Sequence, residues 1–356
     1  MKRIGILTWY FGINYGARAH SLALKKTVES LGYDCEFINF TSSNNWSIEL
    51  HTCCMTGDLK KHPFILMKGM YKWLKFRSQL AAYPRSKKVS TAKEIESLGY
   101  DAIIIGSDEI LNLNHDLANE LYYGVGFRCG FPMLMYAASA GTVSPDTVLS
   151  SEIREGLRNI RFLSVRDNTS QALLQANSEK NVEIVLDPTL LHQFGTGRRR
   201  FYAEDYFLIY SFGALENEKG RIVGLARSKG LKIVCVGRKC EWADKSFEAA
   251  NLDEWLSIYE YASYVATDSY HGLIFAVKYH KEFVLVARGD KTNKIDGLRS
   301  LLGISRECLK PDENIVSYLS APVDYTAIDS AISRERRNSL EYLKNGLEEV
   351  VREGTL

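Results

Sequence analysis

The sequence predicts an α/β protein with two Rossmann-like domains, each built on a parallel β-sheet. Strand-like and helix-like patterns alternate from the first residues, which is typical of parallel sheets covered by helices. Several strand-like runs end in small or polar residues, as strands do at the ligand-binding edge of an open parallel sheet. A chain of 356 residues is also longer than one hydrophobic core usually supports, which favours two domains.

The chain opens with a strand–helix–strand pattern. Residues 3–10 are strand-like, and residues 16–31 carry apolar side chains at helical spacing. Gly32 is typical of the residue that follows a helix, and residues 35–40 form the next strand-like run. This order predicts a βαβ unit and therefore parallel pairing of the two strands.

Four further buried strands are predicted in the first half of the chain: residues 100–106, 132–138, 162–166 and 182–186. The first is followed by Ser107 and Asp108, the second by Ser139, and the last by Asp187 and Pro188. Because parallel strands bring their carboxyl ends to one edge of a sheet, these polar residues are expected to gather there.

A Gly-rich, charged segment without periodicity, residues 195–204, is predicted to link the two domains. The alternation restarts after it, with strands expected at residues 206–212, 232–236, 264–267 and 282–287, and helices at residues 217–228 and 253–262. The resulting domains are residues 1–195 and 196–325. A charged helix over about 326–351 ends the chain, in a segment (326–356) that we expect to return to the first domain.

Composition restricts the classes of function. The net charge is only +2, and no sustained basic stripe is present, so a nucleic-acid-binding protein is not expected. Residues 1–9 form a strand-like run rather than a signal peptide, and no apolar run approaches bilayer length. The seven cysteines are scattered, and Cys53 and Cys54 lack metal-ligand spacing to other ligands. We therefore expect a cytoplasmic protein with reduced thiols, no metal and no resident cofactor.

Residues 60–88 differ from their surroundings because they hold nine Lys or Arg and no acidic residue, interleaved with aromatic and aliphatic side chains. One interpretation is a helix that packs one face on the core and solvates its lysines. The other is a patch that faces anionic lipid headgroups or an anionic substrate, giving a peripheral contact with the membrane.

The most informative motif is the run from Thr267 to Gly272, a polar turn between an apolar strand and an apolar helix. The first N–H groups of a helix have no partner inside it, so the turn favours an anion there. His271 stands in this turn, where it can donate a proton or a hydrogen bond. The alternative is a capped helix with a hydrogen-bonded structural histidine.

Two other turns carry residue types that suit a sugar. Asn14, Tyr15 and Gly16 lie on the first strand-to-helix turn, and Ser107 and Asp108 lie on a later one. Amide and carboxylate groups bind paired hydroxyls, and a tyrosine can stack on a pyranose face. Turn and cap chemistry explains the same residues without a ligand.

Read together, six segments resemble the polysaccharide pyruvyl transferase family over nearly the whole chain. In order they are Asn14-Tyr15-Gly16-Ala17, Tyr100-Asp101 with Gly106-Ser107-Asp108, the strand end from Tyr136 to Gly141, Ser164-Val165-Arg166-Asp167, Asp187-Pro188-Thr189, and the run from Thr267 to Gly272.

The resemblance implies two Rossmann-like domains that face a cleft, similar to the GT-B arrangement of glycosyltransferases. It also implies transfer of pyruvate from phosphoenolpyruvate, the co-substrate, to two hydroxyls of a sugar as a ketal. The acceptor would be a precursor of a cell-surface polysaccharide, expected to be lipid-linked, which places the enzyme in the cytoplasm or at the inner face of the membrane.

By the same resemblance, His271 is the expected general acid and base. Ser269, Tyr270, Gly272, Arg166 and Lys294 are expected to bind the donor, and Asn14, Tyr15, Gly16, Ser107 and Asp108 the acceptor. For Arg166 the structural alternative is a salt bridge to Asp167 or to the neighbouring domain. His20 and His192 are expected to be structural.

The sequence departs from the family pattern at two places. Members often carry arginine where Tyr270 stands, and Lys294 replaces a frequent arginine, keeping the charge but not the bidentate fork. Two alternatives therefore remain open: a GT-B-type glycosyltransferase that uses a nucleotide sugar, and a non-catalytic glycan-binding relative.

Overall fold

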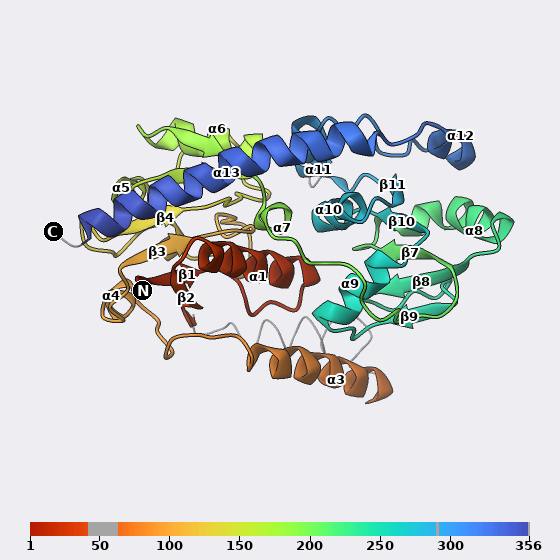
Figure 1. Cartoon of the computed structure of the whole chain (residues 1–356), viewed down its shortest axis with the longest axis horizontal. Helices are drawn as coiled ribbons and strands as arrows, with labels where there is room; N and C mark the ends of the chain where they lie inside the picture. Colours follow the sequence, from red (N-terminus) through yellow and green to blue (C-terminus); the bar gives the residue numbers. More distant parts are fainter. Residues whose placement is uncertain (42–62, 290–291, 355–356) are drawn as a thin grey trace. The chain divides into compact units, whose positions relative to one another are not determined.

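The computed structural model describes residues 1–41, 63–289 and 292–354 and divides the chain into two compact units. Unit 1 comprises Met1–Gln193 and Arg334–Leu356, and unit 2 comprises Phe194–Ser333. Cys53, Cys54 and residues 60–62 of the basic segment lie outside the described residues. Each unit is an α/β structure, as the sequence predicts (Figure 1).

Unit 1 is built on a parallel sheet with the strand order β2-β1-β3-β4. A parallel pair, β5-β6, continues it, since backbone N–H groups of Met135 and Ala138 donate to carbonyls of Phe162 and Ser164. The strands are β1 (Arg3–Leu7), β2 (Asp34–Phe37), β3 (Ala102–Ile105), β4 (Met133–Met135), β5 (Leu163–Val165) and β6 (Val182–Ile184). All six strands predicted for this half are confirmed, most of them a few residues shorter than expected.

Several helices of unit 1 begin after residues that cap them. Asn14 caps the first, and Ser150, Asp167 and Asp187 cap later ones through side-chain oxygens that accept backbone N–H groups. The helices are α1 (Tyr15–Ser30), α3 (Pro63–Leu80), α4 (Ala92–Glu96), the short 3-10 helix η2 (Glu120–Tyr123), α5 (Ser151–Asn159), α6 (Asn168–Asn177) and α7 (Pro188–Leu191).

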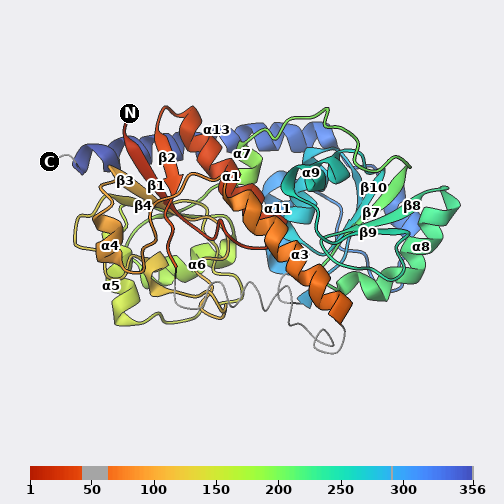
Figure 2. The same cartoon turned by 90° about the horizontal axis from the view of Figure 1, so that it is seen from below.

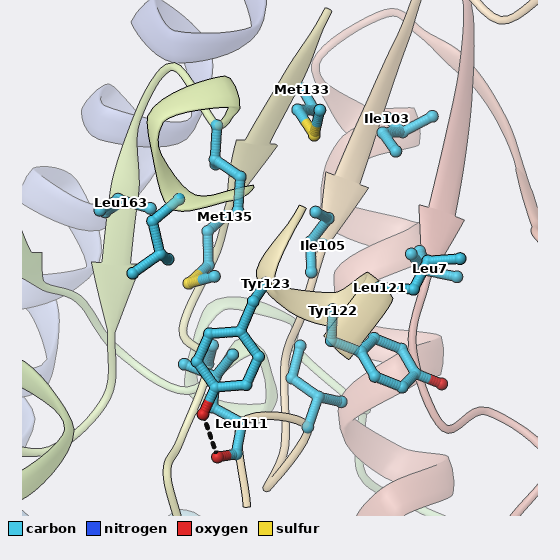
Figure 3. Close-up of a cluster of buried hydrophobic side chains, with 14 of the residues drawn as sticks. Leu7, Ile103, Ile105, Leu111, Leu121, Tyr122, Tyr123, Met133, Met135 and Leu163 are labelled. Carbon is cyan, nitrogen blue, oxygen red and sulfur yellow. Dashed lines mark hydrogen bonds between the residues drawn. The ribbon is translucent and has the colours of Figure 1, made fainter. Parts of the chain in front are cut away.

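The core of unit 1 is formed where the strands meet the segment that follows β3. Ile103, Ile105 and Met135 are fully buried, and Tyr122 and Tyr123 lie against this face of the sheet (Figure 3). The hydroxyl of Tyr123 donates to the carbonyl of Leu111 at 2.6 Å, which satisfies the one polar group of this ring. Burial on both faces explains why β3 is an unbroken apolar run rather than an alternating one.

Unit 2 contains a five-stranded parallel sheet with the order β11-β10-β7-β8-β9 (Figure 1). Its strands are β7 (Tyr206–Tyr210), β8 (Lys232–Val236), β9 (Lys245–Phe247), β10 (Tyr264–Thr267) and β11 (Glu282–Leu285). Its helical elements are η3 (Ala214–Glu218), α8 (Lys219–Ser228), α9 (Leu252–Glu260), α10 (Tyr270–Lys278), α11 (Thr292–Leu302) and α12 (Ile315–Ser320). The sequence did not predict β9, a three-residue edge strand.

The last helix, α13 (Tyr325–Glu353), has residues in both units. In unit 2 the ring of His280 stacks on Tyr325 with 4.5 Å between centroids. In unit 1 the hydroxyl of Ser339 accepts from the backbone N–H of Leu186 at 2.9 Å, and Arg336 donates to the carbonyl of Leu190. Within the three described stretches, no helix combines the length and the apolar character needed to cross a membrane.

Candidate functional site

The turn from β10 into α10 has the predicted form of a strand, a polar cap and a helix start. The hydroxyl of Ser269 accepts from the backbone N–H of Gly272 at 3.4 Å, and the hydroxyl of Thr267 accepts from the N–H of Ser269 at 3.1 Å. No acidic residue stands in the first turn, so the positive end of the helix dipole is not offset by the helix's own sequence.

Asp268 fixes this turn to the neighbouring strand. It is almost fully buried, and its carboxylate accepts hydrogen bonds from the Ser211 hydroxyl (2.8 Å) and the backbone N–H groups of Phe212 (2.8 Å) and Ala214 (2.9 Å). The loop after β7 and the turn after β10 are therefore held together at the carboxyl edge of the sheet. No role was predicted for Asp268, although its position directly after a buried strand is a signal that the sequence contains.

Gly272 is required where it stands by close packing rather than by a special backbone angle. A Cβ atom added to it would lie 2.0 Å from the hydroxyl oxygen of Thr267, which bonds the N–H of Ser269. The space is thus already taken by the side chain that shapes the turn.

Gly272→Ala is therefore expected to destabilise the protein by about 1–3 kcal/mol, the usual cost of overpacking a filled site. Gly224→Ala is the matched control, because Gly224 lies in helix α8 with nothing within 4 Å of the added Cβ. That change is expected to stabilise by up to about 1 kcal/mol. Urea unfolding of both variants checks this, and equal midpoints would contradict the packing argument.

His271 lies in the first turn of α10 and is 7% exposed. Its ring stands perpendicular to that of Tyr270, with 5.4 Å between centroids. Lys294, on α11, is also buried, and α10 packs against α11. The structure thus places His271, Tyr270 and Lys294 in two packed helices of one unit, while their predicted roles stay predictions.

Aromatic side chains of α9 pack against α10. Phe275 of α10 contacts Trp255 and Tyr259 of α9 at centroid distances of 4.6 Å and 6.0 Å. Burial raises the pKa of Tyr259 well above its usual value, and Tyr210 and Asp268 raise it further, so this tyrosine remains neutral. The cluster fixes the start of α10, and with it the position of His271.

Two residues at the same edge were missed by the sequence analysis. Phe212, which follows β7, is 51% exposed, and the guanidinium of Arg288, which follows β11, lies 5.0 Å from its ring centroid. Neither belongs to a motif, so only the sheet order brings them together.

Arg306 has a structural role in unit 2, because its guanidinium donates to Glu282 and to the carbonyls of Phe283 and Ala321.

The carboxyl edge of the first sheet carries a buried polar network. The hydroxyl of Ser107 lies 2.8 Å from Nδ1 of His20, and Nε2 of His20 lies 3.2 Å from a carboxylate oxygen of Asp108. Ser107 and His20 are fully buried, whereas the side chain of Asp108 is 14% exposed. His20 is structural as expected, and it also supports a predicted acceptor residue.

Arg166 connects this network to the end of β6. Its two terminal nitrogens donate to Asp187 at 2.7 Å and to Asp108 at 3.1 Å, and its side chain is 2% exposed. The expected alternative, a salt bridge to Asp167, is wrong. Asp167 instead caps α6, because its carboxylate accepts from the N–H and hydroxyl of Ser170 and from the hydroxyl of Ser139. Whether Arg166 also binds a donor stays a prediction.

Tyr136 completes the buried part of this edge. Its hydroxyl donates to the carbonyl of Leu186 at 3.1 Å. Burial raises the pKa of Tyr136 well above its usual value, and Asp187 raises it further. This phenol is therefore a neutral donor that positions the segment carrying Asp187.

The first turn of unit 1 shows cap chemistry. The side-chain oxygen of Asn14 accepts from the backbone N–H groups of Gly16 (2.8 Å) and Ala17 (3.3 Å), and Asn14 is exposed. Tyr15 is 3% exposed, with its ring 5.3 Å from that of Phe76 on α3. Sugar binding by Asn14, Tyr15 and Gly16 stays a prediction, and stacking by Tyr15 would require this ring to leave its packed position.

Chains of known structure share the fold. One is a putative UDP-N-acetylglucosamine 2-epimerase from Listeria monocytogenes, with 9% identity, a TM-score of 0.54 and 98% of each chain covered. Another is UDP-GlcNAc 2-epimerase from Neisseria meningitidis bound to UDP-GlcNAc, with 9% identity, a TM-score of 0.50, and 98% of this chain and 100% of that chain covered. At such identities the likeness concerns the fold alone, which is GT-B-like.

Among curated proteins, no match is found. The family model described as polysaccharide pyruvyl transferase matches residues 14–290, which is more than half of the chain and includes all six segments on which the resemblance rests. The chain therefore belongs to the polysaccharide pyruvyl transferase family, a family of transferases.

Proposed function

We propose that this protein transfers pyruvate from phosphoenolpyruvate to two hydroxyls of a sugar in the precursor of a cell-surface polysaccharide. The observation that carries the proposal is His271 in the first turn of α10, inside the family match, on a helix whose first turn has no acid. An imidazole at the positive end of a helix suits a small, multiply charged anion that must also be protonated.

The reaction needs one proton placed on carbon. Two C–O bonds form between the sugar hydroxyls and the central carbon of phosphoenolpyruvate, and the bond from that carbon to the phosphate oxygen breaks. One hydroxyl proton ends on the methylene carbon, which becomes a methyl group, and the other leaves with phosphate. His271 protonates the methylene carbon or accepts a hydroxyl proton as the oxocarbenium-like centre forms.

The donor is bound in unit 2. The N–H groups of the first turn of α10 and the helix dipole favour its phosphate or carboxylate, beside Ser269 and Tyr270. Gly272 belongs to the donor site through its place in this turn, where its missing side chain leaves room for Thr267. Lys294 contributes positive charge from α11.

The acceptor is bound by unit 1, through Asn14 and Asp108 at the carboxyl edge of its sheet. Asp108 is held from two sides, by His20 and by Arg166, so its carboxylate is fixed for a hydroxyl to donate to. Ser107 and Gly16 shape the two turns. We propose a lipid-linked oligosaccharide as the acceptor, which places the reaction at the cytoplasmic face of a membrane.

Incubating the protein with phosphoenolpyruvate and a panel of galactosyl, mannosyl and glucosyl acceptors tests the proposal. We expect phosphate release that requires a sugar and a product heavier than the acceptor by the mass of a pyruvate ketal. Because ketal formation uses two hydroxyls, acceptors in which one of the pair is methylated should be inactive. Tight glycan binding without product over long incubation would instead identify a non-catalytic relative.

A second candidate function is glycosyl transfer from a nucleotide sugar. The exposed ring of Phe212 beside Arg288 favours it, because a flat aromatic side chain at this edge can stack on a nucleobase. Thermal unfolding with UDP- or GDP-sugars and with phosphoenolpyruvate separates the two. Stabilisation by a nucleotide sugar alone would favour this candidate over ketal formation.

A further inference from the structure

Helix α3 exposes an apolar stripe to solvent. Five large hydrophobic side chains on it are between 39% and 66% exposed, and they are half of the ten such exposed side chains in the part of the chain that the structure describes. This α3 stripe consists of Leu66, Met67, Met70, Tyr71 and Leu74. Their spacing of three, four and one residues puts them on one side of a helix. Soluble surfaces rarely gather apolar side chains in this way without a binding purpose.

The stripe is not the face by which α3 packs on unit 1. That face carries Phe76, which is fully buried and lies against Tyr15 of α1. The guanidinium of Arg18 lies 4.4 Å from the Phe76 ring centroid and donates to its backbone carbonyl at 2.8 Å. Figure 2 shows α3 beside α1. Because this contact already secures the helix, the α3 stripe is not needed to hold it in place.

Charge distinguishes the kinds of partner that fit the stripe. Residues 63–90 carry seven Lys or Arg and no Asp or Glu. A symmetric contact between two copies of the chain would bring these like charges together, which costs free energy. An anionic lipid surface attracts them, at about 1 kcal/mol for each basic residue near the headgroups.

We propose that α3 is an interfacial helix that inserts its apolar stripe into the headgroup region of an anionic bilayer. Leucine and methionine enter the acyl boundary, Tyr71 lies at headgroup level, and the basic side chains of the segment remain at the lipid phosphates. A short helix of this kind lies in the plane of the membrane. This inference stands on the surface of unit 1 and does not depend on the reaction proposed above.

Vesicle flotation tests the inference. The full chain is mixed with vesicles of phosphatidylcholine, alone or with about 30% phosphatidylglycerol, at about 0.05 M and about 0.5 M salt. We expect binding to the anionic vesicles at low salt and at least tenfold weaker binding at high salt, roughly as charge screening predicts. The double variant Met67→Ser, Leu74→Ser is expected to weaken vesicle binding at least about tenfold, because two apolar side chains that would be buried in the bilayer are lost.

The matched control is Val148→Ser with Val316→Ser, which removes two apolar side chains that are 81% and 60% exposed elsewhere on the chain. This control variant should bind vesicles as the unaltered protein does. Both variants should have the same thermal unfolding midpoint as the unaltered protein. Absence of binding to anionic vesicles at low salt would overturn the inference. So would equal losses in the two variants, or a concentration-dependent dimer that only the α3 variant abolishes. None of these outcomes bears on phosphate release with a soluble acceptor.

Discussion

His271→Ala is expected to lower turnover by about 10²–10⁴-fold, the usual contribution of one positioned acid or base. The loss should appear in kcat rather than in KM, since a proton donor acts on the transition state more than on the bound substrate. Stability should change little. Alanine is the best helix former, and Ser269, Asp268 and the Phe275 cluster keep the start of α10 in place.

His280→Asn is the matched control for this variant. His280 lies just beyond the other end of α10, is half exposed, and has a φ of 50°, which asparagine tolerates. It should leave turnover unchanged. The measurements are phosphate release from phosphoenolpyruvate in the presence of an acceptor and the thermal unfolding midpoint. If the kcat of His271→Ala lies within threefold of the kcat of the unaltered enzyme, the activation free energy has changed by only about 0.7 kcal/mol, and the catalytic role is rejected.

The largest effect on stability is expected for Arg166→Met. The change removes a buried guanidinium that separates Asp108 from Asp187 and leaves two carboxylates without their shared cation. Breaking a buried ion pair from one side typically costs about 3–5 kcal/mol. Arg166→Lys should lose less, because it keeps the charge while it loses the fork that reaches both acids.

Arg158→Met is the matched control, since its pair with Glu155 is two-thirds exposed on both sides and lies on a helix of the same unit. Such a pair is worth about 0–1 kcal/mol. Urea unfolding followed by circular dichroism should therefore give a much lower midpoint for Arg166→Met than for Arg158→Met, with similar slopes. Similar midpoints would mean that the network around Asp108 is not a stabilising one.

Steady-state kinetics of Arg166→Lys separate the two possible roles of Arg166. If it only positions Asp108, the lysine variant should retain the KM for phosphoenolpyruvate while kcat falls. If it binds the donor, the KM for phosphoenolpyruvate should rise as well.

Local patterns account for most of the fold. The apolar run of β3, the cap at Asn14 and the glycine after α1 each predict their element from neighbouring residues alone. The polar cap of α10 does the same for the turn that carries His271. β9 could not be predicted in this way, because a three-residue edge strand is specified by its pairing with β8 rather than by its own residues.

Only part of the candidate site could be predicted from the sequence. The histidine at a helix start and the polar strand ends are local features. The partners of Arg166 are 21 and 58 residues away in the chain, so adjacency pointed to Asp167, which its own helix uses as a cap. Phe212 and Arg288 belong to strands whose order in the sheet no local pattern specifies.

By itself the sequence determined the class of the fold, the family and the position of His271, because periodicity, caps and motifs are properties of residues near one another in the chain. Tertiary structure alone decided the pairing of Arg166 with two carboxylates, the support of Asp108 by His20, and which side of α3 remains apolar and exposed. Those features depend on which distant segments share a surface, and burial against them determines the neighbours and the charge environment of each side chain.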